Sequence, residues 1–253
     1  MLSDSQLREY AENGFLPLGR VMSDDQLHAL QARVDDLTGG STPNERIGYQ
    51  TEKAFRKRGG TKAKYAWQGP SDHYRKLTNM DEDPVFFEYF AHPTFRTIVR
   101  QLIGPDANIR RAFGMLKPAF DGSPLDWHQD AGPGYPVDGD RFCTVWTALD
   151  AATEANGALV VLSGSHRLGL VPRTDGKREL RDAVAGMAGQ EVTLNAEPGE
   201  ALLLNNLVLH SSGSNPTPHS RRAVTVCYVD ANAELQPSDP PILQAELRSM
   251  PQD

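Results

Sequence analysis

Cysteine is scarce in this chain: its 253 residues include only Cys143 and Cys227, each inside an apolar, alternating run. Two such thiols give no sign of a disulfide framework and are typical of buried structural cysteines. Long apolar runs are also lacking, and none approaches the roughly 20 residues of a membrane span. The first 14 residues are polar and have no basic start followed by an apolar core, so no secretory signal is expected. We therefore expect a cytoplasmic protein.

The sequence also lacks an overall positive charge. Its 26 Lys and Arg are outnumbered by 33 Asp and Glu, which gives a formal net charge of −7. This balance argues against nucleic acid or a membrane as partner and leaves a small molecule. Between Ser41 and Lys76 the balance reverses, with nine basic and three acidic residues. Residues 41–76 have no clear period, and we expect either a solvated loop or a lid-like loop that closes over an anionic substrate.

Helix signals are concentrated in the first 105 residues. Ser3 followed by Gln6, and Ser23 followed by Gln26, are capping-box patterns that predict two helix starts. The second helix has apolar residues at helical spacing and is expected to end at Gly39-Gly40. Residues 14–21 read as a short strand between these helices. A further helical region is expected over 84–102, interrupted at His92-Pro93.

After Asn108 the chain changes to short strand-like segments separated by turn residues. Residues 197–200, "EPGE", predict a hairpin turn. Helices followed by about eight strands indicate one α+β domain over residues 1–253 with a double-sheet barrel or jelly-roll core. The expected strands lie within 109–118, 141–150, 157–164, 191–206 and 221–231.

The stretch "DWHQD", residues 126–130, contains the first candidate site. In a strand, His128 and Asp130 would project from the same face and could hold one ion together. A His-x-Asp pair is also compatible with two polar neighbours at a turn. Asp126 could in principle face the same ion, and an exposed turn carboxylate is its other interpretation.

A third ligand would favour the metal site, and His210 is the histidine best placed to supply it. It ends the apolar run "ALLLNNLVLH", as a ligand contributed by a facing strand would. Two histidines and one carboxylate on one face of an octahedron are typical of non-haem Fe(II) oxygenases. Arg221, eleven residues later, could pair with a carboxylate held near the metal. A one-residue shift in register would exchange Arg221 for Arg222.

These residues resemble the phytanoyl-CoA dioxygenase (PhyH) family of Fe(II)/2-oxoglutarate-dependent oxygenases. The resemblance rests on "HQD" at 128–130, "NGALVVLSGSHRLG" at 156–169 and "PGEALLLNNLVLHSSGSNPTPHSRR" at 198–222. It implies a double-stranded β-helix, which is a variant of the jelly roll. It also implies Fe(II), 2-oxoglutarate as co-substrate and O2.

The resemblance places roles on individual residues. His128, Asp130 and His210 match the iron ligands, and because Asp130 is present, halogenation is not expected. Arg221 matches the arginine that binds the distal carboxylate of 2-oxoglutarate. The further expected contacts to the co-substrate are Ser212, Gln129, Trp146, Lys76 and Met115.

The expected activity is the hydroxylation of an unactivated C–H bond in a small polar metabolite or natural-product intermediate, with release of succinate and CO2. Ring closure or epimerisation by the same oxidative chemistry is an alternative. A non-oxidative, cupin-type metal isomerase and a non-catalytic binding module are readings from other classes. The isomerase would need neither Arg221 nor a co-substrate pocket, and the binding module would bind a ligand tightly without oxygen-dependent formation of succinate.

Overall fold

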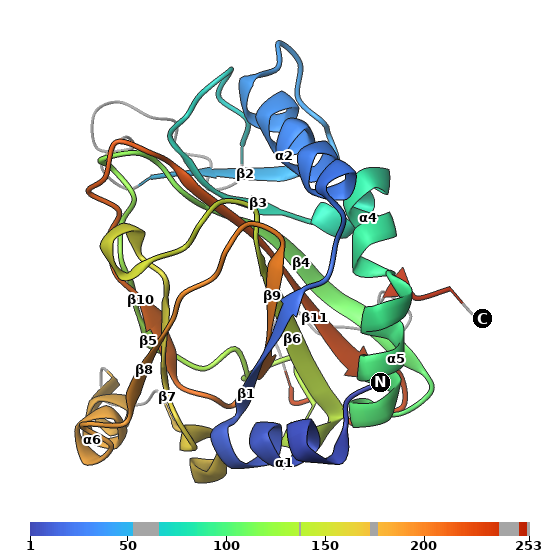
Figure 1. Cartoon of the computed structure of the whole chain (residues 1–253), viewed down its shortest axis with the longest axis vertical. Coiled ribbons are helices and arrows are strands. Elements are labelled where there is room, and N and C mark those ends of the chain that lie inside the picture. Colours follow the sequence, from blue (N-terminus) through green and yellow to red (C-terminus); the bar gives the residue numbers. More distant parts are fainter. Residues whose placement is uncertain (53–65, 137, 173–176, 238–247, 252–253) are drawn as a thin grey trace.

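The computed structural model describes residues 1–52, 66–136, 138–172, 177–237 and 248–251. In these ranges two antiparallel sheets face each other, and helices cover the outer side of the larger one (Figure 1). This arrangement is an α+β fold with a jelly-roll core, as the sequence predicts.

The larger sheet has eight strands in the order β1-β9-β6-β11-β4-β3-β2, with β12 paired to β4. The long strands β4 and β11 lie side by side near its centre and pair over their whole lengths. The strands are β1 (Phe15–Arg20), β2 (Gly48–Thr51), β3 (Tyr74–Thr78), β4 (Ala107–Lys117), β6 (Phe142–Ala148), β9 (Glu200–Asn205), β11 (Arg221–Asp230) and β12 (Arg248–Ser249).

The smaller sheet has four strands in the order β5-β10-β7-β8. Its strand β10 has only three residues but is paired on both sides, so its backbone is fixed from two directions. The strands are β5 (Leu125–His128), β7 (Leu159–Leu162), β8 (Glu191–Leu194) and β10 (His210–Ser212).

Among the described residues, five α-helices accompany the sheets. Both predicted capping boxes are present, at Ser3 and at Ser23, and the helical region after residue 84 divides at His92-Pro93 as expected. Within the described ranges, no helix is long and apolar enough to cross a membrane. The helices are α1 (Asp4–Asn13), α2 (Asp24–Gly39), α4 (Pro84–Phe90), α5 (Pro93–Ile103) and α6 (Arg178–Gly186), with 3-10 turns at Met80–Glu82, Gly139–Arg141, Glu154–Asn156 and Ser165–Leu168.

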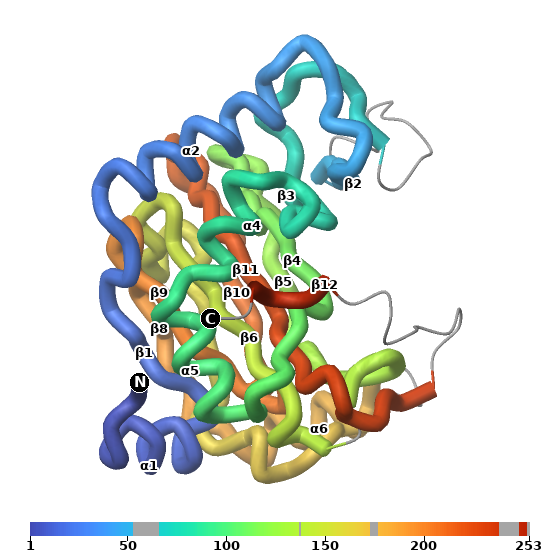
Figure 2. Tube along the Cα trace, turned by 90° about the vertical axis from the view of Figure 1, so that its right-hand side faces the viewer, coloured from blue at the N-terminus to red at the C-terminus, as the bar shows by residue number. Residues whose placement is uncertain are grey.

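The main core lies between the larger sheet and helices α2, α4 and α5 (Figure 2). The four apolar residues of α2 at helical spacing, Leu27, Leu30, Val34 and Leu37, are all buried there. A second cluster lies between the two sheets. Strand β6 shows the division, because Val145 joins the core under the helices and its neighbour Trp146 joins the inner cluster. Both faces of the larger sheet are therefore covered.

The hairpin expected at residues 197–200 is not present. Residues 197–200 do form a turn, since the amide of Glu200 donates to the carbonyl of Glu197. The strands on either side do not pair, however: β8 belongs to the smaller sheet and β9 to the larger. The turn therefore carries the chain from one sheet to the other, a step that local turn chemistry does not distinguish from a hairpin.

The basic segment 41–76 is not a loop throughout. Strands β2 and β3 lie near its two ends and pair with each other at the edge of the larger sheet. Tyr49 and Tyr74 are each 1% exposed, and their ring centroids are 5.3 Å apart. These aromatics are therefore core residues. Residues 53–65, which are part of the predicted lid, lie outside the described residues.

Leu203, in β9, provides a test of the core under the helices. Its side chain is fully buried, so we expect Leu203→Ala to lower the free energy of unfolding by about 2–5 kcal/mol through lost burial and a residual cavity. Urea denaturation measures this change. Leu168→Ala, at a side chain that is 53% exposed, is the control and should change stability little. Equal effects of the two changes would contradict the assigned core.

Candidate functional site

Three predicted ligands come together between the sheets. His128 ends β5 and His210 begins β10, and these two residues are direct partners in the antiparallel pairing. Asp130 follows two residues after His128. Ligand atoms of all three side chains lie within 4.8 Å of one another, close enough to hold a single ion.

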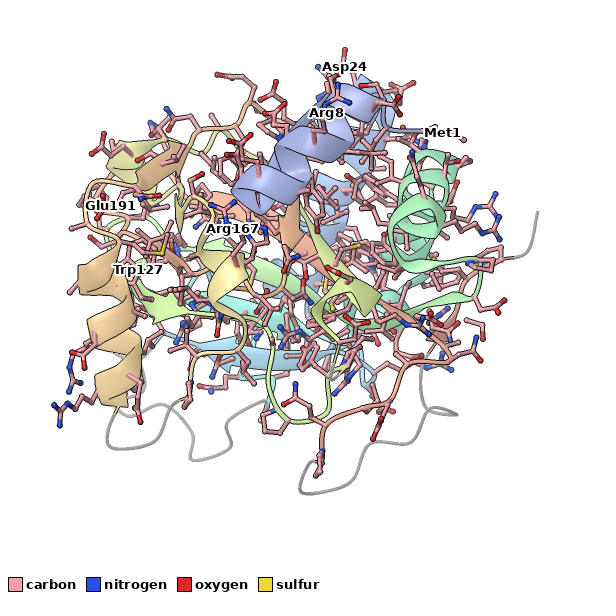
Figure 3. All side chains as sticks on the ribbon, turned by 90° about the horizontal axis from the view of Figure 1, so that it is seen from below. Met1, Arg8, Asp24, Trp127, Arg167 and Glu191 are labelled. Atoms are coloured by element: carbon pink, nitrogen blue, oxygen red, sulfur yellow. The ribbon has the colours of Figure 1, made fainter. Side chains whose placement is uncertain are left out.

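The positions of His210 and Asp130 in the fold differ from the prediction. His210 lies on the strand next to β5 in the same sheet, rather than on a facing strand. Asp130 lies beyond the end of β5, so strand alternation does not direct it. Asp126 is exposed, and its carboxylate lies 3.7 Å from the ammonium of Lys177, so it does not belong to the cluster. Trp127 packs on the outside with α6 (Figure 3).

Backbone carbonyls set the tautomer of both histidines. The Nδ1 atom of His128 lies 2.8 Å from the carbonyl oxygen of Asp126, and that of His210 lies 3.1 Å from the carbonyl oxygen of Val208. Because a carbonyl can only accept, each Nδ1 must carry the proton and donate it. Each Nε2 is then left with its lone pair, the form in which imidazole binds metals.

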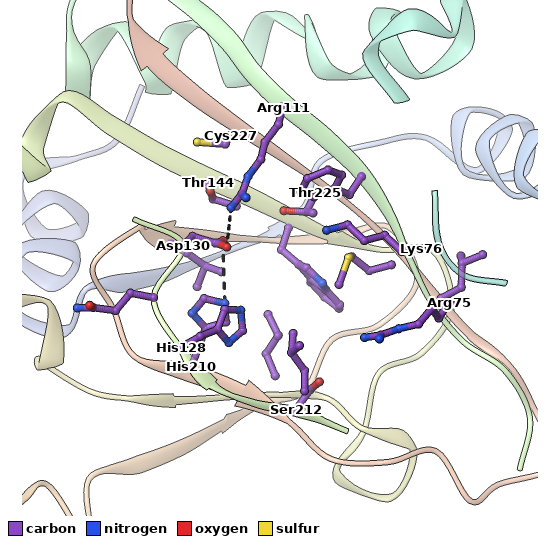
Figure 4. Close-up of a pocket in the computed structure, with 18 of the residues that line it drawn as sticks. Arg75, Lys76, Arg111, His128, Asp130, Thr144, His210, Ser212, Thr225 and Cys227 are labelled. Atoms are coloured by element: carbon purple, nitrogen blue, oxygen red, sulfur yellow. Dashed lines mark hydrogen bonds and ion pairs between the residues drawn. The ribbon is translucent and has the colours of Figure 1, made fainter. Parts of the chain in front are cut away.

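Arg111, on β4, fixes the carboxylate of Asp130. Its Nη2 donates to Oδ1 of Asp130 at 2.6 Å, while Oδ2 lies 4.0 Å from Nε2 of His210 (Figure 4). Burial would raise the pKa of Asp130, but nearby positive charge, chiefly that of Arg111, outweighs it and holds that pKa well below its ordinary value. Asp130 is thus an anion with one oxygen turned toward the imidazoles.

Arg221 is a buried cation at the same cavity. It begins β11, is 3% exposed, and donates through Nη2 to the carbonyl of Gly157 at 3.1 Å. Its Nε is buried and has no hydrogen-bond partner among the described residues. Burial lowers its pKa to about 10, and the charge of Asp150 only partly opposes that effect. A buried guanidinium with an unsatisfied donor is costly unless an anion binds to it.

Arg222 has a different environment, which decides between the two arginines. Its Nε and Nη2 each lie 2.8 Å from a carboxylate oxygen of Asp150, in a bidentate pair, and it also pairs with Asp35. It does not line the cavity. Arg221 is therefore the arginine that is available to a ligand.

The cavity has a volume of about 390 Å³, and its lining includes every residue to which the family resemblance assigned a role. Gln129 lines it, but its amide binds backbone: Nε2 donates to the carbonyls of Gly169 and Leu207, and Oε1 accepts from the amide of Val171. Gln129 thus joins two loops. The other predicted co-substrate contacts that line the cavity are Ser212, Trp146, Lys76 and Met115.

Four further charged residues at the cavity were missed from the sequence: Arg111, Lys117, Arg75 and Glu52. Period-2 alternation would have found two of them, because Arg111 and Lys117 share the inner face of β4 with Met115. Lys117 is 6% exposed and donates to the carbonyls of Ser123 and Gly213 at 2.8 and 2.6 Å. Burial, and then the charge of Arg221, lower its pKa to about 7.

A jelly-roll cavity with two histidines, a carboxylate and a buried arginine defines the class of site found in metal-dependent oxygenases. The sequence model of the family "Phytanoyl-CoA dioxygenase (PhyH)" matches residues 10–223. The chain belongs to this family, and the expected class, an Fe(II)/2-oxoglutarate-dependent dioxygenase, is confirmed. The binding-module and isomerase readings are thereby set aside.

Named relatives agree with this assignment. A probable phytanoyl-CoA dioxygenase of Caenorhabditis elegans is 30% identical over 250 residues, which cover 93% of this chain and 77% of the relative. Among solved structures, EctD from S. alaskensis with 2-oxoglutarate and 5-hydroxyectoine has a TM-score of 0.74 at 20% identity, covering 99% of this chain and 86% of that one. The carbocyclase SnoK from nogalamycin biosynthesis has a TM-score of 0.70 at 21% identity, covering 94% and 87%. At these identities the two structures establish a shared fold.

Gly157 provides a test of how Arg221 is held. It has a φ of +86°, and a Cβ there would lie 2.6 Å from the carbonyl oxygen of Gly213 and 2.9 Å from the side chain of Lys117. We expect Gly157→Ala to destabilise the protein by more than the roughly 1–2 kcal/mol of left-handed strain alone. Thermal denaturation, compared at equal pH, measures this.

Gly189 is the matched control for this test. Its φ is +87°, and an added Cβ would meet nothing within 4 Å. Gly189→Ala should therefore show the backbone strain without the steric clash. If the two alanine variants lose the same stability, the close packing around Gly157 is wrong.

Proposed function

We propose that this protein uses Fe(II) and 2-oxoglutarate to hydroxylate an unactivated C–H bond in a small polar metabolite. Bound iron would supply the oxidation with O2: one oxygen atom would enter the substrate as a hydroxyl group, and the other would enter the succinate formed, together with CO2, from 2-oxoglutarate. The residues present fit both groups: the His-Asp-His cluster offers one nitrogen or oxygen donor from each side chain, and Arg221 offers an unsatisfied buried donor.

The three ligands would hold iron through the two Nε2 atoms and the carboxylate of Asp130. Because Nδ1 of each histidine already donates a hydrogen bond to a carbonyl oxygen, the rings would be oriented before a metal binds. Arg111 does the same for Asp130. Such preorganisation favours binding because little side-chain freedom remains to be lost.

Arg221 and Ser212 would hold the distal carboxylate of 2-oxoglutarate. Both side chains are buried and line the cavity, and a guanidinium matches a carboxylate in shape and charge. Trp146 and Leu204, from the inner face of the larger sheet, contribute apolar walls that exclude water and strengthen the ion pair.

The single observation that carries this proposal is the unsatisfied Nε of buried Arg221 in the cavity that contains the metal cluster. A metal isomerase would not require a buried arginine that binds the carboxylate of a co-substrate. Hydroxylation, ring closure and epimerisation would use the same residues, and the mass of the product distinguishes them. A hydroxylated product is 16 mass units heavier than the substrate, by the mass of one oxygen atom, whereas an epimer has the same mass.

Replacement of a ligand tests the metal site. We expect His210→Ala to weaken Fe(II) binding by more than the roughly 10–100-fold that loss of an outer hydrogen-bond partner costs, because a direct ligand is removed. Equilibrium dialysis of the metal-depleted protein under nitrogen measures the affinity. Oxygen-dependent formation of succinate from 2-oxoglutarate should be lost in parallel.

His219→Ala is the control, since His219 is exposed and does not line the cavity. It should bind iron and form succinate as the wild type does. Wild-type iron affinity in the His210→Ala variant would refute the ligand assignment. If the wild type binds iron but forms no succinate, the metal site would stand and the assignment of 2-oxoglutarate as co-substrate would be wrong.

A further inference from the structure

The cavity keeps an excess of positive charge that the co-substrate does not use. Among its described lining residues, two are carboxylates, Asp130 and Glu52. Five are cationic: Arg75, Lys76, Arg111, Lys117 and Arg221. The formal excess is three positive charges, of which Lys117 contributes a part because its pKa is about 7.

Loading of the site does not remove this excess. Resting on the proposed function, Fe(II) brings two positive charges and 2-oxoglutarate brings two negative ones, so the balance is unchanged. Arg111 is paired with Asp130, and Arg221 is reserved for the co-substrate. The ammonium of Lys117 is held by two carbonyls. The remaining cations, Arg75 and Lys76, are neighbours on β3, and Lys76 is itself an expected contact of the co-substrate.

Of these two residues, Arg75 has the cationic group that is available to a substrate. It is half-buried, and it has no hydrogen-bond or ion-pair partner among the described residues. Figure 4 shows its guanidinium directed from β3 into the pocket. The neighbouring ammonium of Lys76 lies over the ring of Phe113, 3.5 Å from its centroid. Lys76 is thus fixed at the same wall and adds to the positive potential there.

We propose that the primary substrate is a small organic anion whose carboxylate or phosphate group binds Arg75. A guanidinium presents two parallel N–H donors that match either group, and a partly enclosed site strengthens the pair. Apolar side chains beside it, including Phe113 and Met115, would contact the hydrocarbon part. The volume of about 390 Å³ is at the small end of the roughly 300–1,000 Å³ of ligand pockets, so the anion is a small one.

The test compares probes that differ in charge but hardly in shape. The protein, loaded with Fe(II) and saturating 2-oxoglutarate under nitrogen, is titrated calorimetrically with 4-methylpentanoate and with its neutral isostere 4-methylpentanamide. 3-Methylbutyl phosphate serves as the phosphate probe, and the tighter of the two anions identifies the headgroup. We expect the better anion to bind about tenfold or more tightly than the amide.

Variants assign the preference to Arg75. Arg75→Gln should abolish the difference between anion and amide, and Arg75→Lys, which keeps the charge, should retain most of it. Arg178→Gln removes the same charge from an exposed position on α6 and should leave the preference intact. The affinity for 2-oxoglutarate, titrated separately, should be unchanged in Arg75→Gln.

Anion and amide affinities that are equal in the wild type, or an absence of binding by every probe, would overturn the proposal. So would a loss of 2-oxoglutarate affinity in Arg75→Gln, because Arg75 would then belong to the co-substrate. These outcomes are distinct from failure of the proposed function, in which the wild type would not bind 2-oxoglutarate in the presence of Fe(II).

Discussion

The pairing of β5 with β10 is the constraint on which the site depends. It makes His128 and His210 direct neighbours across the smaller sheet, and because β10 is also paired with β7, the register cannot slip without breaking bonds on both sides. A shift of one residue would turn His210 and Ser212 away from the cavity together. The two histidines and Ser212 are therefore positioned by a single three-residue strand, whereas Asp130 is held by Arg111.

The buried charges follow from this geometry. Enclosed cations are costly without partners, and the fold supplies an internal partner to some of them: Arg111 has Asp130, and Arg222 has Asp150. Arg221 and Arg75 have no carboxylate partner among the described residues. In the proposed function, anions that enter the cavity would offset this cost, so the electrostatic part of recognition would be in place before they bind. The other face of the larger sheet packs against α2, α4 and α5, and this core provides stability that offsets the cost of the unpaired cations.

Much of the fold and site was predictable from sequence because the signals are local. Capping boxes, helical spacing in α2 and period-2 alternation in β6 each depend on residues close in the chain. The sheet to which β9 belongs could not be predicted, because a turn has the same chemistry within a hairpin and between sheets. Period-2 alternation could have placed Arg111 on the inner face of β4, but its role comes from contact with Asp130, nineteen residues away, which no local pattern shows. Likewise, Arg222 could be separated from Arg221 only by the position of Asp150.

The central claim is that the His-Asp-His cluster and Arg221 form one site for iron and 2-oxoglutarate. The most direct measurement is the anaerobic visible spectrum of the metal-depleted protein after addition of Fe(II) and 2-oxoglutarate, where the chelated co-substrate gives a weak charge-transfer band. We predict the band in the wild type and in Arg222→Gln, and its loss at the same concentrations in Asp130→Ala and Arg221→Gln. A wild-type protein without the band, or an Arg221→Gln variant with the full band at unchanged 2-oxoglutarate affinity, would contradict the claim.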